Sequence, residues 1–200
     1  MVRFLNCALM APWFPGWRLG TPWMTVVTTV WLATVAAVLS VGCSAAAPTS
    51  GGQAGVRGFA IYLPAAEITA QRMLNADLDA LELQEAPVLT SDDIISYDGE
   101  THEMALTPLA AERIGALDVP TSGRPFVVCV DGQPIYSGAF WVSLSSLSYP
   151  GVVIDTLPAQ MERPIRIQLG YPESLGLFAG PDPRSHPKII ESLIEAGKLK

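Results

Sequence analysis

The feature that most constrains this chain is an apolar run from Trp23 to Val41 that ends at Gly42-Cys43. Two arginines precede the run, and no Asp or Glu occurs before Cys43. A positive flank followed by an apolar segment and a small residue is typical of an export signal. The sequence therefore predicts that residues 1–42 direct export and that only the remainder folds as a globular part.

Cys43 resembles the lipid-bearing cysteine of bacterial lipoproteins, because a small residue precedes it and small residues follow it. Ser40 departs from that pattern, which favours Leu, Val or Ile three residues before the cysteine. We expect cleavage of a signal peptide, residues 1–42, and attachment of a diacylglyceryl group with fatty acids such as palmitate. Two acyl chains give stable anchoring, which predicts a protein on the extracytoplasmic side of the cell membrane.

Two alternatives remain for this segment. About 20 apolar residues can cross a bilayer, so residues 23–41 could stay as an uncleaved membrane span. Ordinary secretion is the other alternative. All three interpretations place the rest of the chain outside the cytoplasm.

The composition after Cys43 limits the domain organisation and the partners. Residues 43–57 are rich in Ala, Ser, Gly, Pro and Thr and are predicted to be a flexible tether. The remaining residues, 58–200, are enough for one domain. After Cys43 the chain has 10 basic and 19 acidic residues, and 10 − 19 gives a net charge of −9. This charge argues against nucleic acid and anionic lipid head groups as partners.

Periodicity in residues 58–200 predicts an α+β fold with one mainly antiparallel sheet and helices packed on a face. Strands are predicted at 59–63, 101–106, 125–130, 135–142, 152–154 and 165–169, and helices within 65–83, at 90–95, at 108–117 and from about 187. The clearest element is the hairpin, because Asp131-Gly132 separates two apolar runs. Its first strand is apolar on both faces, which predicts a central position covered by helices. Cys129 in that strand is expected to be a buried thiol without a disulfide.

Catalytic motifs are not found: the chain has no nucleotide-binding glycine loop, HExxH, GxSxG or CxxC. One local group carries possible chemistry. If residues 98–102 are extended, Asp98, Glu100 and His102 project from one face, where they could bind a divalent cation or pair a base with a carboxylate. Gly99 favours a turn instead, which would give these residues a structural role. We expect no cofactor and no resident metal.

Three aromatic residues, Tyr136, Trp141 and Tyr149, lie in and after the hairpin. They could form an exposed surface for a protein partner or a glycan. The alternative is that they pack in the core.

Several short segments carry a resemblance to known families: Pro87 to Asp98, Thr101-His102, Leu106-Thr107, Arg124 to Val128 and Asp131-Gly132. Together they resemble a family of uncharacterised bacterial lipoproteins, which implies no activity. Residues 87 to about 140 are also similar to the extracytoplasmic head of the SecD translocase subunit. That similarity implies a shared α/β building block, whereas the membrane bundle of SecD has no counterpart here.

These observations predict a lipid-anchored binding or accessory module of the cell envelope that does not catalyse a reaction. Its expected partners are the membrane, through the anchor, and a protein or another envelope component. The alternative is a metal-dependent or acid/base enzyme that uses Asp98, Glu100 and His102.

Overall fold

The computed structural model describes residues 56–200, which belong to one compact unit. Its strands are β1 (Phe59–Tyr62), β2 (Leu89–Thr90), β3 (Ile94–Tyr97), β4 (Glu103–Leu106), β5 (Arg124–Val130), β6 (Gln133–Trp141), β7 (Tyr149–Asp155) and β8 (Ile165–Tyr171). Its α-helices are α1 (Ala70–Met73), α2 (Pro108–Gly115), α3 (Leu157–Gln160) and α4 (Pro187–Glu195), and its 3-10 helices are η1 (Leu78–Ala80), η2 (Ser91–Asp93) and η3 (Glu173–Leu175).

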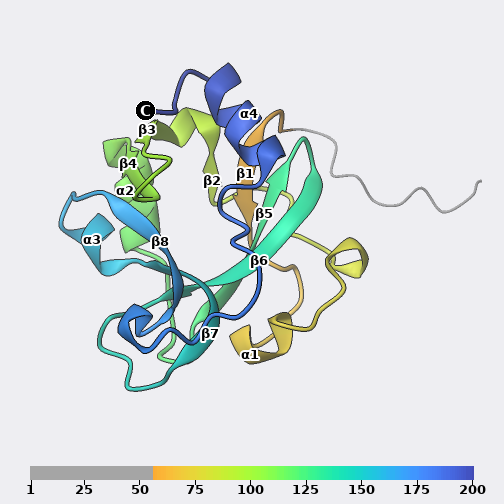
Figure 1. Cartoon of the computed structure of the whole chain (residues 1–200), viewed down its shortest axis with the longest axis vertical. Coiled ribbons are helices and arrows are strands. Elements are labelled where there is room, and N and C mark those ends of the chain that lie inside the picture. Colours follow the sequence, from red (N-terminus) through yellow and green to blue (C-terminus); the bar gives the residue numbers. More distant parts are fainter. Residues whose placement is uncertain (1–55) are drawn as a thin grey trace, which may run out of the picture. The chain divides into compact units, whose positions relative to one another are not determined.

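All eight strands form one sheet in the order β2-β1-β5-β6-β7-β8-β4-β3 (Figure 1). Neighbouring strands are antiparallel except β6 and β7, which are parallel. The fold is therefore a mainly antiparallel sheet with a few helices, as the sequence predicts at this coarse level.

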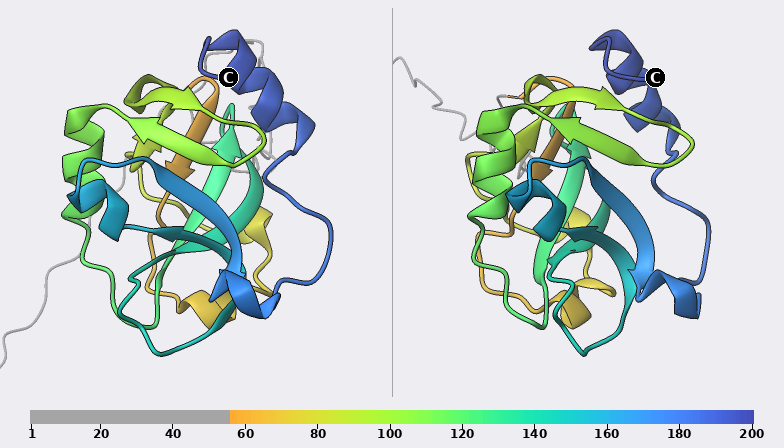
Figure 2. Two further views of the ribbon diagram at one scale, coloured as in Figure 1. Left: turned by 60° about the vertical axis from the view of Figure 1, so that its left-hand side comes forward. Right: turned by 90° about the vertical axis from the view of Figure 1, so that its left-hand side faces the viewer.

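The sheet curls on itself because its two edge strands are consecutive in the chain. Only η2 separates β2 from β3, and three residues reach about 10 Å at most. Both edges must therefore lie close together, and Figure 2 shows the strands wrapped around a common interior. We call the junction between the edge strands β2 and β3 the seam. Arg113 of α2 lies there: its Nε donates to the carbonyl of Val88 at 2.8 Å, and its Nη2 lies 2.7 Å from Oδ1 of Asp93.

Strand β5 has a buried residue at nearly every position, so it is central as predicted. Phe126, Val128 and Val130 belong to the large inner cluster, while Val127 and Cys129 pack in a second cluster on the other face. That outer face is covered by the irregular segment 63–84, which contains α1 and η1, and not by a long helix.

The two ends of the curled sheet are closed differently. At one end lies α4, whose Ile189 and Leu193 join the inner cluster. The C-terminal residues then continue along β3, where the N–H of Tyr97 donates to the carbonyl of Lys198 at 2.7 Å. At the opposite end lies the connection between β6 and β7, and Figures 1 and 2 agree on this arrangement.

The structure confirms the hairpin, α2 and α4, and it corrects two predicted helices. Residues 90–95 form η2 and the start of β3 because Ile94 and Tyr97 are buried in the sheet. Residues 65–83 contain only α1 and η1. In addition, β7 begins at Tyr149, earlier than predicted.

Candidate functional site

A turn separates Asp98, Glu100 and His102, which would share one face only if residues 98–102 were extended. Oδ1 of Asp98 accepts hydrogen bonds from the N–H groups of Glu100 and Thr101 at 2.9 and 2.8 Å. These bonds, that of Thr101 first, hold the pKa of Asp98 below its usual value. Glu100 is exposed, whereas His102 is buried. Residues 98–102 are therefore not extended: Asp98 and its backbone bonds close the turn between β3 and β4 that Gly99 favours.

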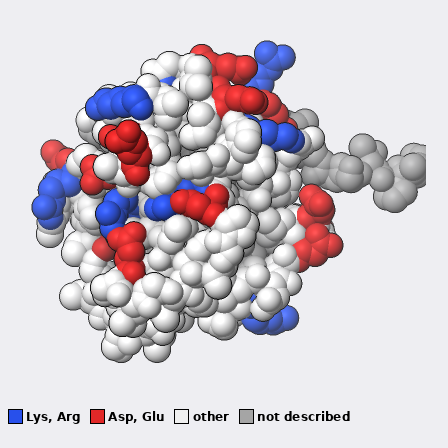
Figure 3. All heavy atoms as spheres, viewed as in Figure 1, with Lys and Arg blue, Asp and Glu red and all other residues white. Residues whose placement is uncertain are grey.

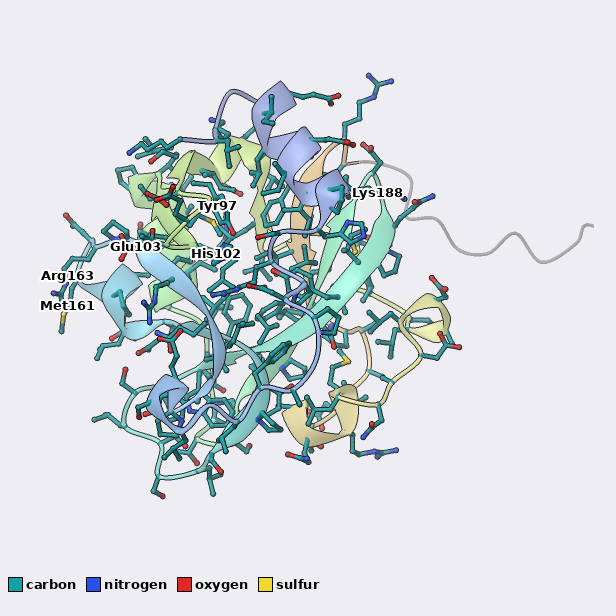
Figure 4. All side chains as sticks on the ribbon, in the orientation of Figure 1. Tyr97, His102, Glu103, Met161, Arg163 and Lys188 are labelled. Carbon is teal, nitrogen blue, oxygen red and sulfur yellow. The ribbon has the colours of Figure 1, made fainter. Side chains whose placement is uncertain are left out.

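His102 ends this turn with a backbone φ of 56°, and its ring is enclosed by protein groups. The residue is only 6% exposed. Nδ1 lies 2.9 Å from Oη of Tyr97, and Nε2 lies 3.8 Å from Oδ2 of Asp182. Figure 4 shows Tyr97 and His102 next to each other on the β3–β4 hairpin.

The C-terminal segment supplies the remaining members of this polar cluster, which we define as Tyr97, His102, Asp182 and Arg184. Arg184 Nε lies 2.9 Å from Oδ1 of Asp182, and Nη2 lies 2.7 Å from Oδ2. Its Nη1 also donates to the carbonyl of Ile167 in β8 at 2.8 Å. The paired Asp182 and Arg184 thus fasten the segment after η3 to β8 and to His102.

The electrostatics of the cluster favour neutral His102 and Tyr97 rings beside the charged pair of Asp182 and Arg184. Burial, followed by the Arg184 charge, lowers the pKa of His102, although Asp182 and Asp98 oppose this. Burial raises the pKa of Tyr97 to about 12. The side-chain hydrogen bond from Arg184 is the main cause that lowers the pKa of Asp182.

This arrangement limits the chemistry of His102. Nδ1 shares a hydrogen bond with the Tyr97 hydroxyl, and Nε2 faces Asp182. A general base needs one nitrogen within reach of a substrate. Here both nitrogens face protein groups: one hydrogen bond joins His102 to Tyr97, and a 3.8 Å contact brings the ring beside Asp182 of the C-terminal segment.

The three aromatic residues are inside the protein. Tyr136, Trp141 and Tyr149 are all buried, so the predicted exposed aromatic surface is wrong. Trp141 stacks on Tyr149 with ring centroids 5.5 Å apart, and the Tyr149 hydroxyl donates to the carbonyl of Ala70 at 3.2 Å. Tyr136 belongs to the large inner cluster, whereas Trp141 and Tyr149 pack with Ala70 in a separate cluster.

The other candidate features are a metal site, the Cys129 thiol and the lipidation site Cys43. Within residues 56–200, no three His, Cys, Asp or Glu side chains are grouped so that they could hold a metal ion. Burial raises the pKa of the Cys129 thiol to about 11, which makes it a poor nucleophile. Cys43 lies outside the described residues. Within the described part of the chain, no helix has the length and apolar character needed to cross a membrane.

Sequence reasoning missed Asp182 and Arg184. They are some 80 residues from His102 and stand in an irregular, proline-containing segment. Short-range patterns carry no information about such a contact. Comparison with known proteins adds no further candidate, because no family model, curated protein or solved structure matches the chain.

Proposed function

We propose that this chain is a lipid-anchored extracytoplasmic lipoprotein, and that residues 58–200 are one non-catalytic binding or accessory module of the cell envelope. The observation that carries the proposal is the apolar run that ends at Gly42-Cys43 and is followed by small residues. The likeness to uncharacterised bacterial lipoproteins supports the same location. The anchor would be two acyl chains on Cys43.

The contacts of His102 support a binding role over an enzymatic one. Both ring nitrogens face protein groups, and the carboxylate of Asp98 is engaged by two backbone N–H groups. An acid/base enzyme would need these groups around a substrate. Asp98 and Glu100 are not placed with the ring around a common space, so these three residues do not fit the acid/base alternative.

The anchor is tested by the intact mass of the membrane-fraction protein, measured beside a Cys43→Ala variant. We expect a chain that begins at Cys43 and carries the lipid, and an unprocessed chain for the variant. The same unprocessed mass for both proteins would make residues 23–41 a permanent span and end the lipoprotein proposal. A mature chain without lipid would indicate secretion.

A further inference from the structure

Residues 176–186, which we call the strap, join η3 to α4 without forming a helix or a strand (Figures 1 and 2). Among the described residues, no backbone-to-backbone hydrogen bond connects residues 177–185 to the sheet. Gly176 and Gly180 have positive φ values, and no atom lies within 4 Å of a Cβ added to either one. A segment without backbone bonds to its neighbours opens locally at a lower free energy than the sheet does.

A few side chains hold the strap against the sheet. Phe178 is half-buried and packs on the inner cluster. The Arg184 side chain is only 12% exposed, and its Nη1 donates to the carbonyl of Ile167 in β8 at 2.8 Å. Arg184 also bonds both carboxylate oxygens of Asp182, whose Oδ2 lies 3.8 Å from Nε2 of His102. The paired strap residues therefore lie against the buried His102 ring.

The closed strap leaves a protonated His102 short of one hydrogen-bond acceptor. A protonated ring carries an N–H donor on both nitrogens. Tyr97 Oη can accept one of them, since it lies 2.9 Å from Nδ1. Nε2 is 3.8 Å from Asp182, which is beyond hydrogen-bond distance. A proton on the ring thus adds a second cation beside a carboxylate that Arg184 already neutralises.

Charged and titratable groups act on the His102 ring from the turn, β3, β8 and the strap: Asp98, Tyr97, Arg166, Asp182 and Arg184. Figure 3 shows that most acidic side chains on the face seen in Figure 1 lie next to basic ones, so neither sign dominates it. Asp98 is engaged by two backbone N–H groups of its own turn. Burial and then the Arg184 charge outweigh the two carboxylates, so the pKa of His102 is lowered while the strap is closed.

We infer that the strap is a lid that opens in acid, because protonation of His102 releases Asp182 and Arg184 from the β3–β4 hairpin. Since Phe178 packs on the inner cluster and Asp182 lies against His102, the open strap uncovers apolar and polar groups that the closed strap buries. The linkage is reciprocal, so opening of the strap lets His102 bind its proton more tightly. Every group in this device lies within residues 97–186, so its test is independent of the anchor at Cys43.

Trypsin cleavage after Arg184 reports the open strap, because the protease must take up a side chain that the closed strap engages. A free peptide of residues 179–187 gives the reference rate of the same bond at each pH. For the full-length chain in detergent, we expect the ratio of protein to peptide cleavage to rise at least about threefold from about pH 7 to about pH 5.

Two histidine variants identify the trigger. His102→Asn should remove the rise, whatever its ratio at neutral pH. His186→Asn is the matched control, because it replaces the other histidine near the strap and keeps a side chain that can cap α4. With its own variant peptide as reference, it should retain the rise.

Each other result overturns the inference. Equal ratios at both pH values would show that acid does not open the strap. A rise that persists in His102→Asn would exclude His102, and a rise lost in His186→Asn would make the cap of α4 the trigger. Should His102→Asn not fold, NMR titration of the His102 ring decides: Arg184→Leu should move its pKa toward the usual value, and an unchanged pKa would show that strap and ring are not coupled.

Discussion

At the scale of single residues, His102 links protonation to folding. Burial and the Arg184 charge lower its pKa in the folded state, whereas an unfolded histidine titrates near its usual value. Below that value the unfolded chain binds the proton first, so the free energy of unfolding falls as the pH drops. The pKa values of Asp93, Asp98 and Asp182 are lowered. These carboxylates titrate at a lower pH than His102, so they do not obscure the pH range in which His102 changes the stability.

The first prediction is that a His102→Asn variant loses this dependence. Asn tolerates the positive φ of 56° at this position and does not titrate. We expect the stability of the wild type to decrease between about pH 7 and about pH 5, and that of the variant to change much less. Urea unfolding at each pH measures both slopes, and equal slopes would show that His102 titrates normally in the folded protein.

The second prediction concerns two glycines with different surroundings. A Cβ on Gly138 would lie 2.5 Å from Cζ of Phe126 and 2.7 Å from the carbonyl oxygen of Val152. Because a backbone atom of β7 is in the way, Gly138→Ala should cost at least about 3 kcal/mol. Gly99→Ala is the control, since its Cβ would meet only Leu199 at 3.5 Å, and its cost should stay within about 0.5 kcal/mol. A tolerated Gly138→Ala, measured by thermal unfolding, would argue against the β6–β7 pairing.

At the scale of elements, the segment after η3 is an irregular strap that depends on one arginine. Arg184 bonds both oxygens of Asp182 and the carbonyl of Ile167. The third prediction is that Arg184→Leu loosens the strap, so amide hydrogen exchange in residues 179–186 becomes at least about tenfold faster. Arg163→Leu is the control, because the Arg163 side chain donates to the sulfur of Met161, outside the strap. Equal exchange in both variants would show that apolar packing alone holds the strap.

The elements also show what local sequence patterns predict and where they fail. Asp131-Gly132 predicts its hairpin because the turn residues and both strands are adjacent in the chain. Thr90 to Asp93 predicts a helix start, and the capping contacts exist: the N–H of Thr90 donates to Oδ2 of Asp93 at 2.8 Å. The helix ends after one turn because Ile94 pairs with Leu106 of β4. Local helix and strand propensities do not predict this contact, since it depends on the neighbouring strand.

The same reasoning explains the outcome for the candidate site. Asp98 and Gly99 correctly indicate a turn, which is a local property. The partners of His102 come from residues 97 and 182, and only the first of these is near in sequence. Sequence left both exposure and core packing open for the three aromatic residues, because burial depends on what covers a strand, and the cover of Trp141 and Tyr149 includes Ala70 and Leu74 of the irregular segment 63–84.

At the scale of the whole molecule, the curled sheet is held at its seam by side chains. Arg113 of α2 joins the carbonyl of Val88, just before β2, to Asp93, just before β3. Burial raises the pKa of Asp93, but hydrogen bonds from Arg113 and Thr90 outweigh it and keep the pKa below its usual value. The Asp93 carboxylate is thus charged at neutral pH and available to the guanidinium.

The fourth prediction follows from this seam. Arg113→Met keeps the apolar stem but removes both contacts, and because the Arg113 side chain is 40% exposed the expected loss is about 1–2 kcal/mol. The informative readout is where protection is lost: amide exchange should accelerate in β2 and β3, the two strands that are far apart in the order of the sheet, and not in β7 between them. Arg72→Met, on α1, is the control. If Arg113→Met lowers global stability while exchange rises equally in every strand, the seam has no separate opening and the curled sheet unfolds as a single closed unit.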